Sequence, residues 1–516
     1  MTQNAPNEAR TFTHREIMLI IGALTLGMLL AALDQTIVAT ALPTIVGDLG
    51  GLNHLSWVVT AYLLTSTAST PLYGKLGDLY GRKRLFQAAI VIFLAGSVLS
   101  GLAGNMTQLI AFRAVQGLGA GGLMSLALAI VGDVIPPRQR GRYQGYFGAV
   151  FALSSVVGPL VGGLFVGHLS WRWVFYINLP LGALALVVTS AVLRLPTVRR
   201  SHSIDYLGSA LLVSAVSCAL LVTVWGGTEY PWGSGTIRGL IAVAAVLLGL
   251  FLLQERRAAE PVLPLRMFRQ SVFSVASAAS FIVGMAMFGA IIFVPLFLQV
   301  VNGVSPTRAG LLLTPLMGGI IVASVGSGRI ISHWGRYKVF PVAGAAILTA
   351  GLFLLSRFDV DTSRLVQSLS MVVIGLGVGL IMQNLVLAVQ NAAAPQDLGT
   401  ATSAAAFFRS MGGSFGVAVF GAIFNARLSE HLSALVPGGR IDVDALRAGP
   451  EALQALPPGA RTLVVDAFAR SLHSTFLWGV PVALLGFVVV LFLKELPLRD
   501  TAHAAPADSL ADELAA

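Results

Sequence analysis

Asp34 is the residue with the clearest capacity for chemistry, because it interrupts a long run of uncharged side chains. Residues 17–33 hold no charged residue, and residues 35–42 again hold none. An aspartate at the centre of a membrane helix costs about 2.5–3.5 kcal/mol on insertion scales, and such residues usually face the bundle interior or a watery cavity. A carboxylate there can bind and release a proton. Asp34 is therefore a candidate proton-coupling residue; the alternative is a buried aspartate that only caps or pairs.

Arg113 is the expected partner of Asp34. It lies inside the apolar stretch 108–133, roughly 8 Å from its outer end, and Asp34 lies roughly 12 Å from the outer end of its own stretch. A neighbouring arginine favours an ionised carboxylate, whereas dry surroundings favour the protonated form. A movement that changes hydration or the Asp–Arg distance could therefore switch proton binding. The alternative is an arginine that snorkels to the interface.

The segment GKLGDLYGRKR, residues 74–84, combines glycines with an acid among bases. Glycines allow close helix ends and a tight turn, and an aspartate beside a helix N-terminus is stabilised by the helix dipole. We predict an inner latch that holds an outward-facing state together; simple topogenic charge is the alternative. The latch residues and possible members of the same network are Gly74, Asp78, Gly81, Arg82, Lys83, Asp133 and Arg142.

Glycine and proline gather in the apolar stretch 143–167, where membrane helices tolerate them and use them for close packing. We predict a seal against the other half of the molecule, with ordinary helix packing as the alternative; its residues are Gly148, Gly158, Pro159, Gly162 and Gly163. Polar residues in other apolar stretches are candidate liners of a substrate cavity. They are Tyr62, Gln116, Gln299, Gln383, Asn384 and Arg409, the last of which could instead snorkel inward.

The sequence lacks the motifs of ATP binding, metal binding and nucleophilic catalysis. The sequence contains no Gly-x4-Gly-Lys-Ser/Thr phosphate loop, no His/Cys metal cluster and no credible nucleophile triad. We therefore expect neither an enzyme nor a cofactor or metal site, and a proton gradient as the driving force. One charge moved across about 150 mV supplies roughly 3.5 kcal/mol.

The composition requires a membrane around these residues. Of 516 residues, 56% are hydrophobic and 11% charged, whereas soluble domains carry about 25% charged residues. A span needs about 20 mostly apolar residues. The stretches that meet this requirement predict fourteen helices, at 17–42, 55–77, 85–104, 108–133, 143–167, 174–195, 206–226, 238–254, 271–301, 310–331, 339–356, 365–391, 404–427 and 472–496.

Lysine and arginine fall mainly on one side of these spans. With the N-terminus inside, most of the 33 basic residues lie in inner segments, which is the positive-inside distribution. We expect a multi-pass protein of the cytoplasmic (inner) cell membrane with both termini in the cytoplasm. The basic charge would set topology and meet anionic lipid, so we assign no nucleic-acid partner.

The chain also repeats itself. GKLGDLYGRKR (74–84) matches GRIISHWGRYK (328–338), and GLGAGGLM (117–124) matches GLGVGLIM (375–382). Two related halves with a site at their interface are a transporter plan. The predicted organisation is a cytoplasmic N-terminus (1–16), a six-helix bundle (17–195), two inserted helices (206–254), a second six-helix bundle (271–496) with an outer loop (428–471), and a disordered cytoplasmic tail (497–516).

Together these motifs resemble the major facilitator superfamily, and within it the fourteen-helix drug/proton antiporters of the QacA- and EmrB-like family. The match covers nearly the whole chain. It rests on GKLGDLYGRKR, LDQTIVATALPTI (33–45), RAVQGLGAGG (113–122), GPLVGG (158–163), WRWVFYINLP (171–180) and EPVLPLRMFR (260–269). The resemblance implies an all-α fold of two six-helix bundles plus two inserted helices, and it links Asp34 and Arg113 to proton coupling.

The expected function is proton-coupled export of amphipathic or hydrophobic drugs or antibiotics by a monomer that alternates its access. Family members specialised for lipophilic cations often carry extra carboxylates in the second half, and this chain has none at depth. Neutral, zwitterionic or anionic compounds are therefore favoured. Export of a native metabolite or lipid is one alternative. A non-transporting sensor or scaffold is another, but it would gain nothing from a costly buried Asp–Arg pair.

Overall fold

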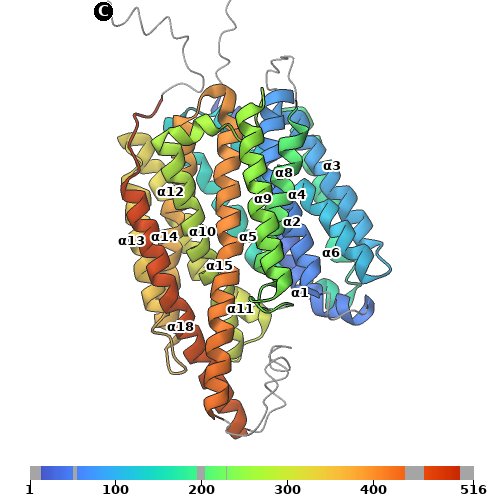
Figure 1. Cartoon of the computed structure of the whole chain (residues 1–516), viewed down its shortest axis with the longest axis vertical. Helices are drawn as coiled ribbons and strands as arrows, with labels where there is room; N and C mark the ends of the chain where they lie inside the picture. Colours follow the sequence, from blue (N-terminus) through green and yellow to red (C-terminus); the bar gives the residue numbers. More distant parts are fainter. Residues whose placement is uncertain (1–12, 50–54, 194–203, 228, 436–457, 500–516) are drawn as a thin grey trace, which may run out of the picture.

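The computed structural model is a bundle of long α-helices (Figure 1). It describes residues 13–49, 55–193, 204–227, 229–435 and 458–499. Several expectations fall outside these residues. They are the first part of the N-terminal segment, the basic residues 194–200, the middle of the outer loop and the tail beyond 499.

Helix occupies most of each of the fourteen predicted ranges. The first six ranges hold α1 (His14–Leu49), α2 (Leu55–Tyr80), α3 (Arg82–Gly101), α4 (Met106–Val134), α5 (Pro137–His168) and the pair α6 (Trp173–Tyr176) and α7 (Asn178–Val192). The inserted helices are α8 (Tyr206–Trp225) and α9 (Gly235–Arg257). The remaining helices are α10 (Ser271–Val300), α11 (Pro306–Leu312), α12 (Thr314–Trp334), α13 (Val339–Leu355), α14 (Arg364–Ala392), α15 (Leu398–Leu435) and α18 (Pro458–Leu491).

Twelve of the described helices are long and apolar enough to cross a membrane, which makes the chain a multi-pass membrane protein. The predicted spans 55–77 and 339–356 lie outside this set of twelve. The first corresponds to α2, and the second to α13, an apolar helix of only 17 residues. Fourteen membrane crossings therefore stay a prediction.

Local sequence sets where the helices begin and end. The side chain of Asn105 accepts a hydrogen bond from the Gln108 N–H, 2.9 Å away, and so caps α4. Pro137 occupies the first turn of α5. Gly81 ends α2 with φ 92° and Gly335 ends α12 with φ 71°, backbone angles that favour glycine. These two glycines occupy equivalent positions in the repeated segments 74–84 and 328–338 and both have a positive φ, but their ψ angles differ, at 129° for Gly81 and 2° for Gly335.

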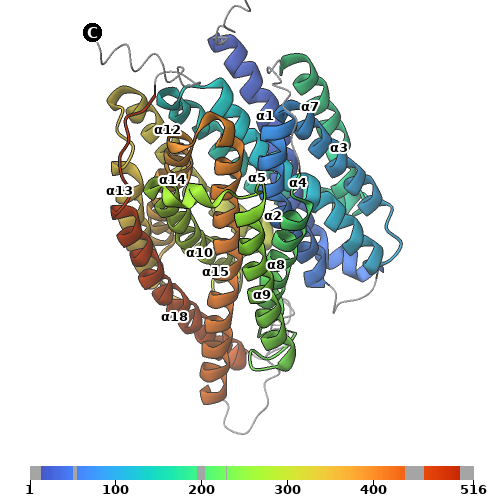
Figure 2. The same cartoon turned by 45° about the horizontal axis from the view of Figure 1, so that its top comes forward.

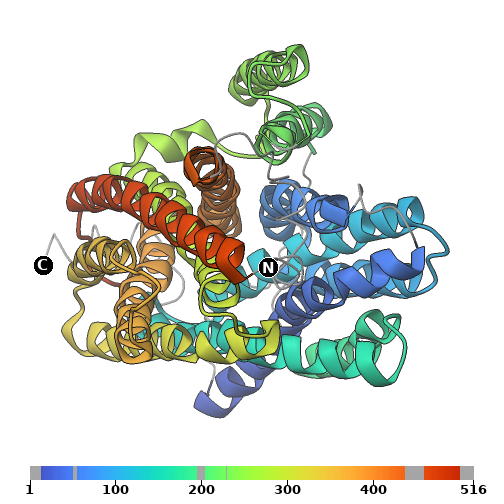
Figure 3. The ribbon, with the colours of Figure 1, turned by 90° about the horizontal axis from the view of Figure 1, so that it is seen from below.

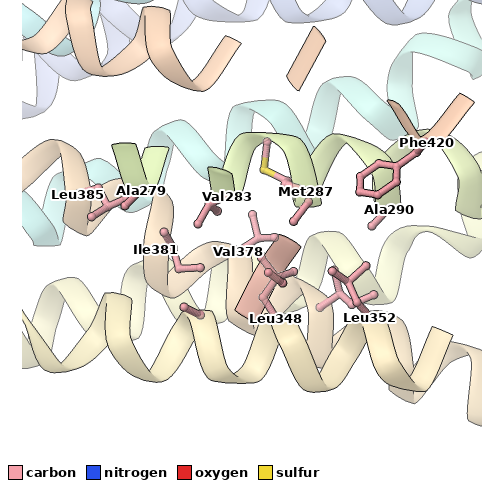
Figure 4. Close-up of a cluster of buried hydrophobic side chains, with 14 of the residues drawn as sticks. Ala279, Val283, Met287, Ala290, Leu348, Leu352, Val378, Ile381, Leu385 and Phe420 are labelled. Carbon is pink, nitrogen blue, oxygen red and sulfur yellow. The ribbon is translucent and has the colours of Figure 1, made fainter. Parts of the chain in front are cut away.

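The helices form two groups, with the inserted pair α8 and α9 at the edge (Figures 2 and 3). The first group comprises α1 to α7, and the second comprises α10 to α18. The second group is held by a dry core between α10, α13 and α14, where Val283 and Met287 meet Leu348 and Val378 (Figure 4). α8 packs on α2 and on α15, whereas α9 packs mainly on α8. The inserted helices therefore touch both groups without separating them.

Two helices are longer than a bilayer requires. α15 has 38 residues and α18 has 34, or about 57 and 51 Å at 1.5 Å per residue. They project together beyond the bundle at one end (Figure 1). Their contact continues there through Phe424 and Phe468, whose ring centroids lie 5.7 Å apart. Helix therefore occupies 428–435 and 458–471, both predicted as parts of an outer loop.

The two groups meet tightly at the opposite end, which we call the closed end. It comprises the α2–α3 turn, the α4–α5 turn and the start of α15. On one side of it, α5 crosses α12 at Gly141 and Gly328, so closely that a Cβ at Gly328 would meet the Gly141 carbonyl. On the other side, a Cβ at Gly74 would meet Ser403 of α15. Glycine at these crossings lets the backbones touch.

We predict that Gly328→Val will loosen the closed end. Overpacking costs about 1–3 kcal/mol, so the melting temperature in detergent should fall by several degrees. Gly326→Val is the matched control, because a Cβ there meets nothing within 4 Å. Equal melting temperatures for the two variants would contradict the close crossing.

Candidate functional site

The structure brings Asp34 and Arg113 together in the interior of the first group. Arg113 Nη1 of α4 lies 2.5 Å from Asp34 Oδ2 of α1. The exposed fractions of the two side chains are 0% for Asp34 and 1% for Arg113. A pair this dry is stable only if further hydrogen bonds satisfy the remaining polar atoms.

Three further side chains supply these bonds. Gln116 Nε2 donates to Asp34 Oδ1 over 2.8 Å, and Asn178 Nδ2 donates to the same oxygen over 2.9 Å. Ser97 Oγ accepts from both amides, at 3.1 Å from Gln116 and 2.9 Å from Asn178, and donates to the Phe175 carbonyl. The carboxylate is therefore held by α4 and α7, with α3 behind them.

Aromatic and main-chain contacts fix the arginine. Its guanidinium carbon lies 4.2 Å from the centroid of the Tyr62 ring, a distance suited to a cation–π contact. The Tyr62 hydroxyl donates to the Ala31 carbonyl, one turn before Asp34. Arg113 Nη1 also donates to Gln116 Oε1 over 2.7 Å. Arg113 is therefore held from α2 and α4, and it cannot simply snorkel away.

Binding of one proton at Asp34 would change the contacts that hold this site together. Protonation of Asp34 would cancel the charge that Arg113 and both amides now face, and leaving a buried charge unpaired is strongly unfavourable. The amide of Asn178 has an unused acceptor, because its Oδ1 is buried without a hydrogen-bond partner among the described residues. That acceptor lies on the amide group that already contacts Asp34.

The glycine motif of α5 supports α1 at this site. A Cβ at Gly158 would meet Thr36, and one at Gly162 would meet Ile37 and Thr40. These residues follow Asp34 within two turns. The predicted seal against the other half is thus not made by these two glycines, which pack within their own half.

Other members of that motif face different neighbours. A Cβ at Gly148 would lie 3.7 Å from Ile320 of α12, and Pro159 approaches Gly310 of α11. Gly163 has open space around it. Contact with the second group therefore falls to Gly148 and Pro159.

Asp78 ties the closed end together across the two groups. Its Oδ1 accepts from the Gly399 N–H over 3.0 Å, and its Oδ2 accepts from the Thr400 N–H over 2.7 Å and from the Thr400 hydroxyl. Both amides belong to the first turn of α15, whose positive dipole end stabilises an acid. Asp78 thus caps a helix of the other group, while Arg82 pairs with it at 2.7 Å.

A second acid extends this network. Arg82 Nη1 lies 2.8 Å from Asp133 Oδ1 at the end of α4. Lys83 takes no part in the described bonds of Asp78; its Nζ donates instead to the Ser190 carbonyl of α7. The expected involvement of Arg142 is wrong, because this side chain is exposed and its guanidinium lies beside the Tyr143 ring.

Arg140 occupies the interior position that Arg142 was expected to take. Its side chain is 1% exposed, its Nε donates to the Ile135 carbonyl over 2.7 Å, and its Nη1 reaches Gln390 Oε1 of α14 over 3.4 Å. Gln390 in turn donates to the Leu128 carbonyl of α4. Arg140 therefore also joins the two groups at the closed end, where its Nη2 donates to the Gly132 carbonyl next to Asp133.

The segment 260–269, which we call the strap, links two elements of the closed end through ion pairs. Lys75 Nζ lies 2.6 Å from Glu260 Oε2, and Arg266 Nη2 lies 2.9 Å from Asp397 Oδ2, directly before α15. The strap thus holds α2 at one point and the start of α15 at another.

The segment WRWVFYINLP holds α1 at its opposite end. Trp171 Nε1 donates to Asp48 Oδ2 over 2.7 Å, and Arg172 lies 3.2 Å from the same oxygen. These two hydrogen bonds lower the pKa of Asp48 from its usual value. The last part of the segment starts α7 and delivers Asn178 to Asp34.

The predicted cavity residues are not brought together. Tyr62 and Gln116 belong to the Asp34 network, and Asn384 is buried, donating to the Leu380 carbonyl over 2.7 Å. Three others, Gln299, Gln383 and Arg409, are half-buried on α10, α14 and α15. The described contacts do not join them into one site.

Sequence reasoning missed three residues that the site uses: Ser97, Asn178 and Arg140. A polar residue in an apolar stretch was the available signal for the first two. Arg140 was one of several basic residues in a turn. Its burial depends on helix phase, which the turn sequence alone does not give.

We predict that Asp78→Asn will destabilise the closed end. The change removes the charge that pairs with Arg82 and caps α15, and it should lower the melting temperature in detergent by several degrees. Asp466→Asn is the matched control, because Asp466 also pairs with an arginine four residues on, Arg470, but its side chain is 39% exposed and exposed pairs contribute little. An equal or larger loss for the control would refute the latch.

Comparisons with known proteins agree with this architecture. The family model "Major Facilitator Superfamily" matches residues 24–417. An uncharacterized MFS-type transporter of Mycobacterium tuberculosis (strain H37Rv) is 46% identical over 484 residues, which are 93% of this chain and 70% of the relative. The multidrug transporter protein MdtP of Bacillus subtilis is 39% identical over 508 residues, covering 93% and 94% of the two chains.

Solved structures share the fold at low identity. The proton:xylose symporter XylE superposes with a TM-score of 0.61 at 15% identity, covering 94% of this chain and 97% of that chain. The helical bundle, the repeated halves and the matched family model lead to one conclusion. The chain belongs to the major facilitator superfamily of membrane transporters.

Proposed function

We propose that the protein exports amphipathic or hydrophobic compounds, drugs and antibiotics among them, in exchange for protons. It would do so as one of the fourteen-helix drug/proton antiporters, in the cytoplasmic membrane, with both termini in the cytoplasm. The observation that carries the proposal is the dry Asp34–Arg113 pair with its amide donors. Ionisable residues inside membrane segments are rare and mark proton or substrate pathways.

The proposed cycle alternates access between two sides. In the described state, Asp34 pairs with Arg113, and Asp78 holds the start of α15 at the closed end. A proton arriving from outside would neutralise Asp34 and loosen its hold on Arg113. Opening of the closed end would then break the Asp78 cap and expose the path to the cytoplasm, where substrate enters as the proton leaves.

Relatives support drug export as the first candidate. Two proteins of Bacillus subtilis named for multidrug transport or resistance are 39% and 37% identical to this chain. We propose small hydrophobic or amphipathic molecules as the substrates, a monomer as the working unit and no nucleic-acid partner. Export of a native metabolite or lipid by the same scaffold is the second candidate.

We predict that Asp34→Asn abolishes proton-driven transport. Proteoliposomes that contain the purified protein should accumulate the zwitterionic dye rhodamine B when a pH gradient, acid inside, is imposed. The variant should lose this uphill uptake, because an amide cannot exchange a proton. Asp48→Asn is the matched control, since Asp48 lies on the same helix with its side chain 52% exposed. Full uphill transport by the Asp34→Asn variant would refute the mechanism.

We predict that Asn178→Leu slows proton-driven uptake. Asn178 Nδ2 donates a hydrogen bond to Asp34 Oδ1 over 2.9 Å, and loss of a hydrogen bond to a charged group is worth about 1.5–3 kcal/mol, so the rate should fall by about tenfold or more. Thr189→Val is the matched control, because Thr189 is equally buried on the same helix but donates only within α7. Equal uptake rates for the two variants would contradict the role of Asn178.

A further inference from the structure

Arg409 lies deep in the second group and has no counter-ion among the described residues. It stands eleven residues beyond Leu398, where α15 begins at the closed end. That distance is about 16 Å along the helix, near the middle of a hydrocarbon core about 30 Å thick. The neighbouring helices α10 and α14 hold no acidic residue. The acids of the other helices that pack on α15, Asp78, Asp133 and Asp466, pair with other arginines. At this depth the side chain is too far from the closed end to snorkel there.

Arg409 lies on the face of α15 that meets α10. A Cβ at Gly284 of α10 would meet the Arg409 main chain, and one at Gly416 would meet the Met285 carbonyl. Gly416 is two turns beyond Arg409, so both residues share one face of the helix. This face turns toward the bundle and away from lipid, which agrees with the high cost of a cation in hydrocarbon.

The burial of α15 changes at Arg409. Residues 398–407 are buried at the closed end, whereas residues 408–411 are half-buried. Arg409 therefore lies just beyond the fully buried part of α15 at the closed end. Its guanidinium has no hydrogen-bond partner among the described residues, yet none of its nitrogens is fully buried. A solute of the right charge could reach it.

Apolar surroundings accompany this cation. Phe281 and Phe288 of α10 are half-buried beside α15, where a Cβ at Gly412 would meet the first and a Cβ at Gly413 the second. The Phe281 and Phe415 rings lie 5.7 Å apart. A positive charge one helical turn from aromatic side chains suits a molecule with an anionic group and an apolar body.

We propose that Arg409 is an anion subsite, which binds the carboxylate, sulfonate or phosphate of amphipathic substrates. The proposal rests on the export function proposed above and names a substrate class for it. A guanidinium pairs with a carboxylate through two parallel hydrogen bonds. The subsite is separate from Asp34, whose charge Arg113 already balances. Proton binding and anion binding therefore use different groups.

The test measures binding of two xanthene dyes to the purified full-length protein in detergent by fluorescence anisotropy. Fluorescein carries a carboxylate, and rhodamine 123 is a cation of similar size. Arg409→Gln should weaken fluorescein binding by about tenfold or more and leave rhodamine 123 within about threefold. Arg409→Lys keeps the charge and should retain most of the fluorescein affinity. Unchanged rhodamine 123 binding by the Gln variant also shows that it is folded.

Three results would overturn the subsite: no fluorescein binding by the wild-type protein, equal losses for both dyes, or no loss of fluorescein binding in Arg409→Gln. Asp34→Asn separates this proposal from the proposed function. It should bind fluorescein normally while losing proton-driven uptake. Absence of uphill transport of any dye by the wild-type protein would refute antiport. The dye affinities measured in detergent test only the anion subsite at Arg409.

Discussion

The ion pair between Asp34 and Arg113 sets the packing of the whole first group. Two opposite charges at 0% and 1% exposure are tolerable only with complete hydrogen bonding, so helices that carry donors must approach closely. Glycine makes this possible. A Cβ at Gly96 would meet the Gln116 main chain, and a Cβ at Gly117 would meet Tyr62. These small residues therefore stand directly beside the polar ones they bring together.

The two halves share a fold but not a chemistry. Gly81 and Gly335 occupy equivalent positions in the two loops, and both have a positive φ. Asp78 in the first loop caps α15, whereas the second loop carries Ser332 at the matching position. The second half also holds its central arginine without a carboxylate among the residues described. The first half thus pairs its buried aspartate, Asp34, with an arginine, whereas Arg409 of the second half has no carboxylate partner among the described residues.

Sequence reasoning predicted how deep a residue lies along its helix, but it missed the direction in which the side chain points. Depth along a helix follows from residue counting, and it was enough to pair Asp34 with Arg113. The direction in which a side chain points follows from packing, so Asn178 was overlooked and Arg142 was chosen where Arg140 is buried. For the same reason the glycines of GPLVGG were predicted to seal against the other half, although Gly158 and Gly162 of α5 pack against α1.

The Asp34–Arg113 pair and the closed end are joined by α4. This helix carries Arg113 near one end and Asp133 near the other, twenty residues or about 30 Å away. Asp133 holds Arg82, which holds Asp78 on the start of α15. A continuous helix transmits a displacement of one end to the other. In the proposed cycle, a change in the contact between Asp34 and Arg113 would therefore reach, through one continuous helix, the ion pairs that join the two groups.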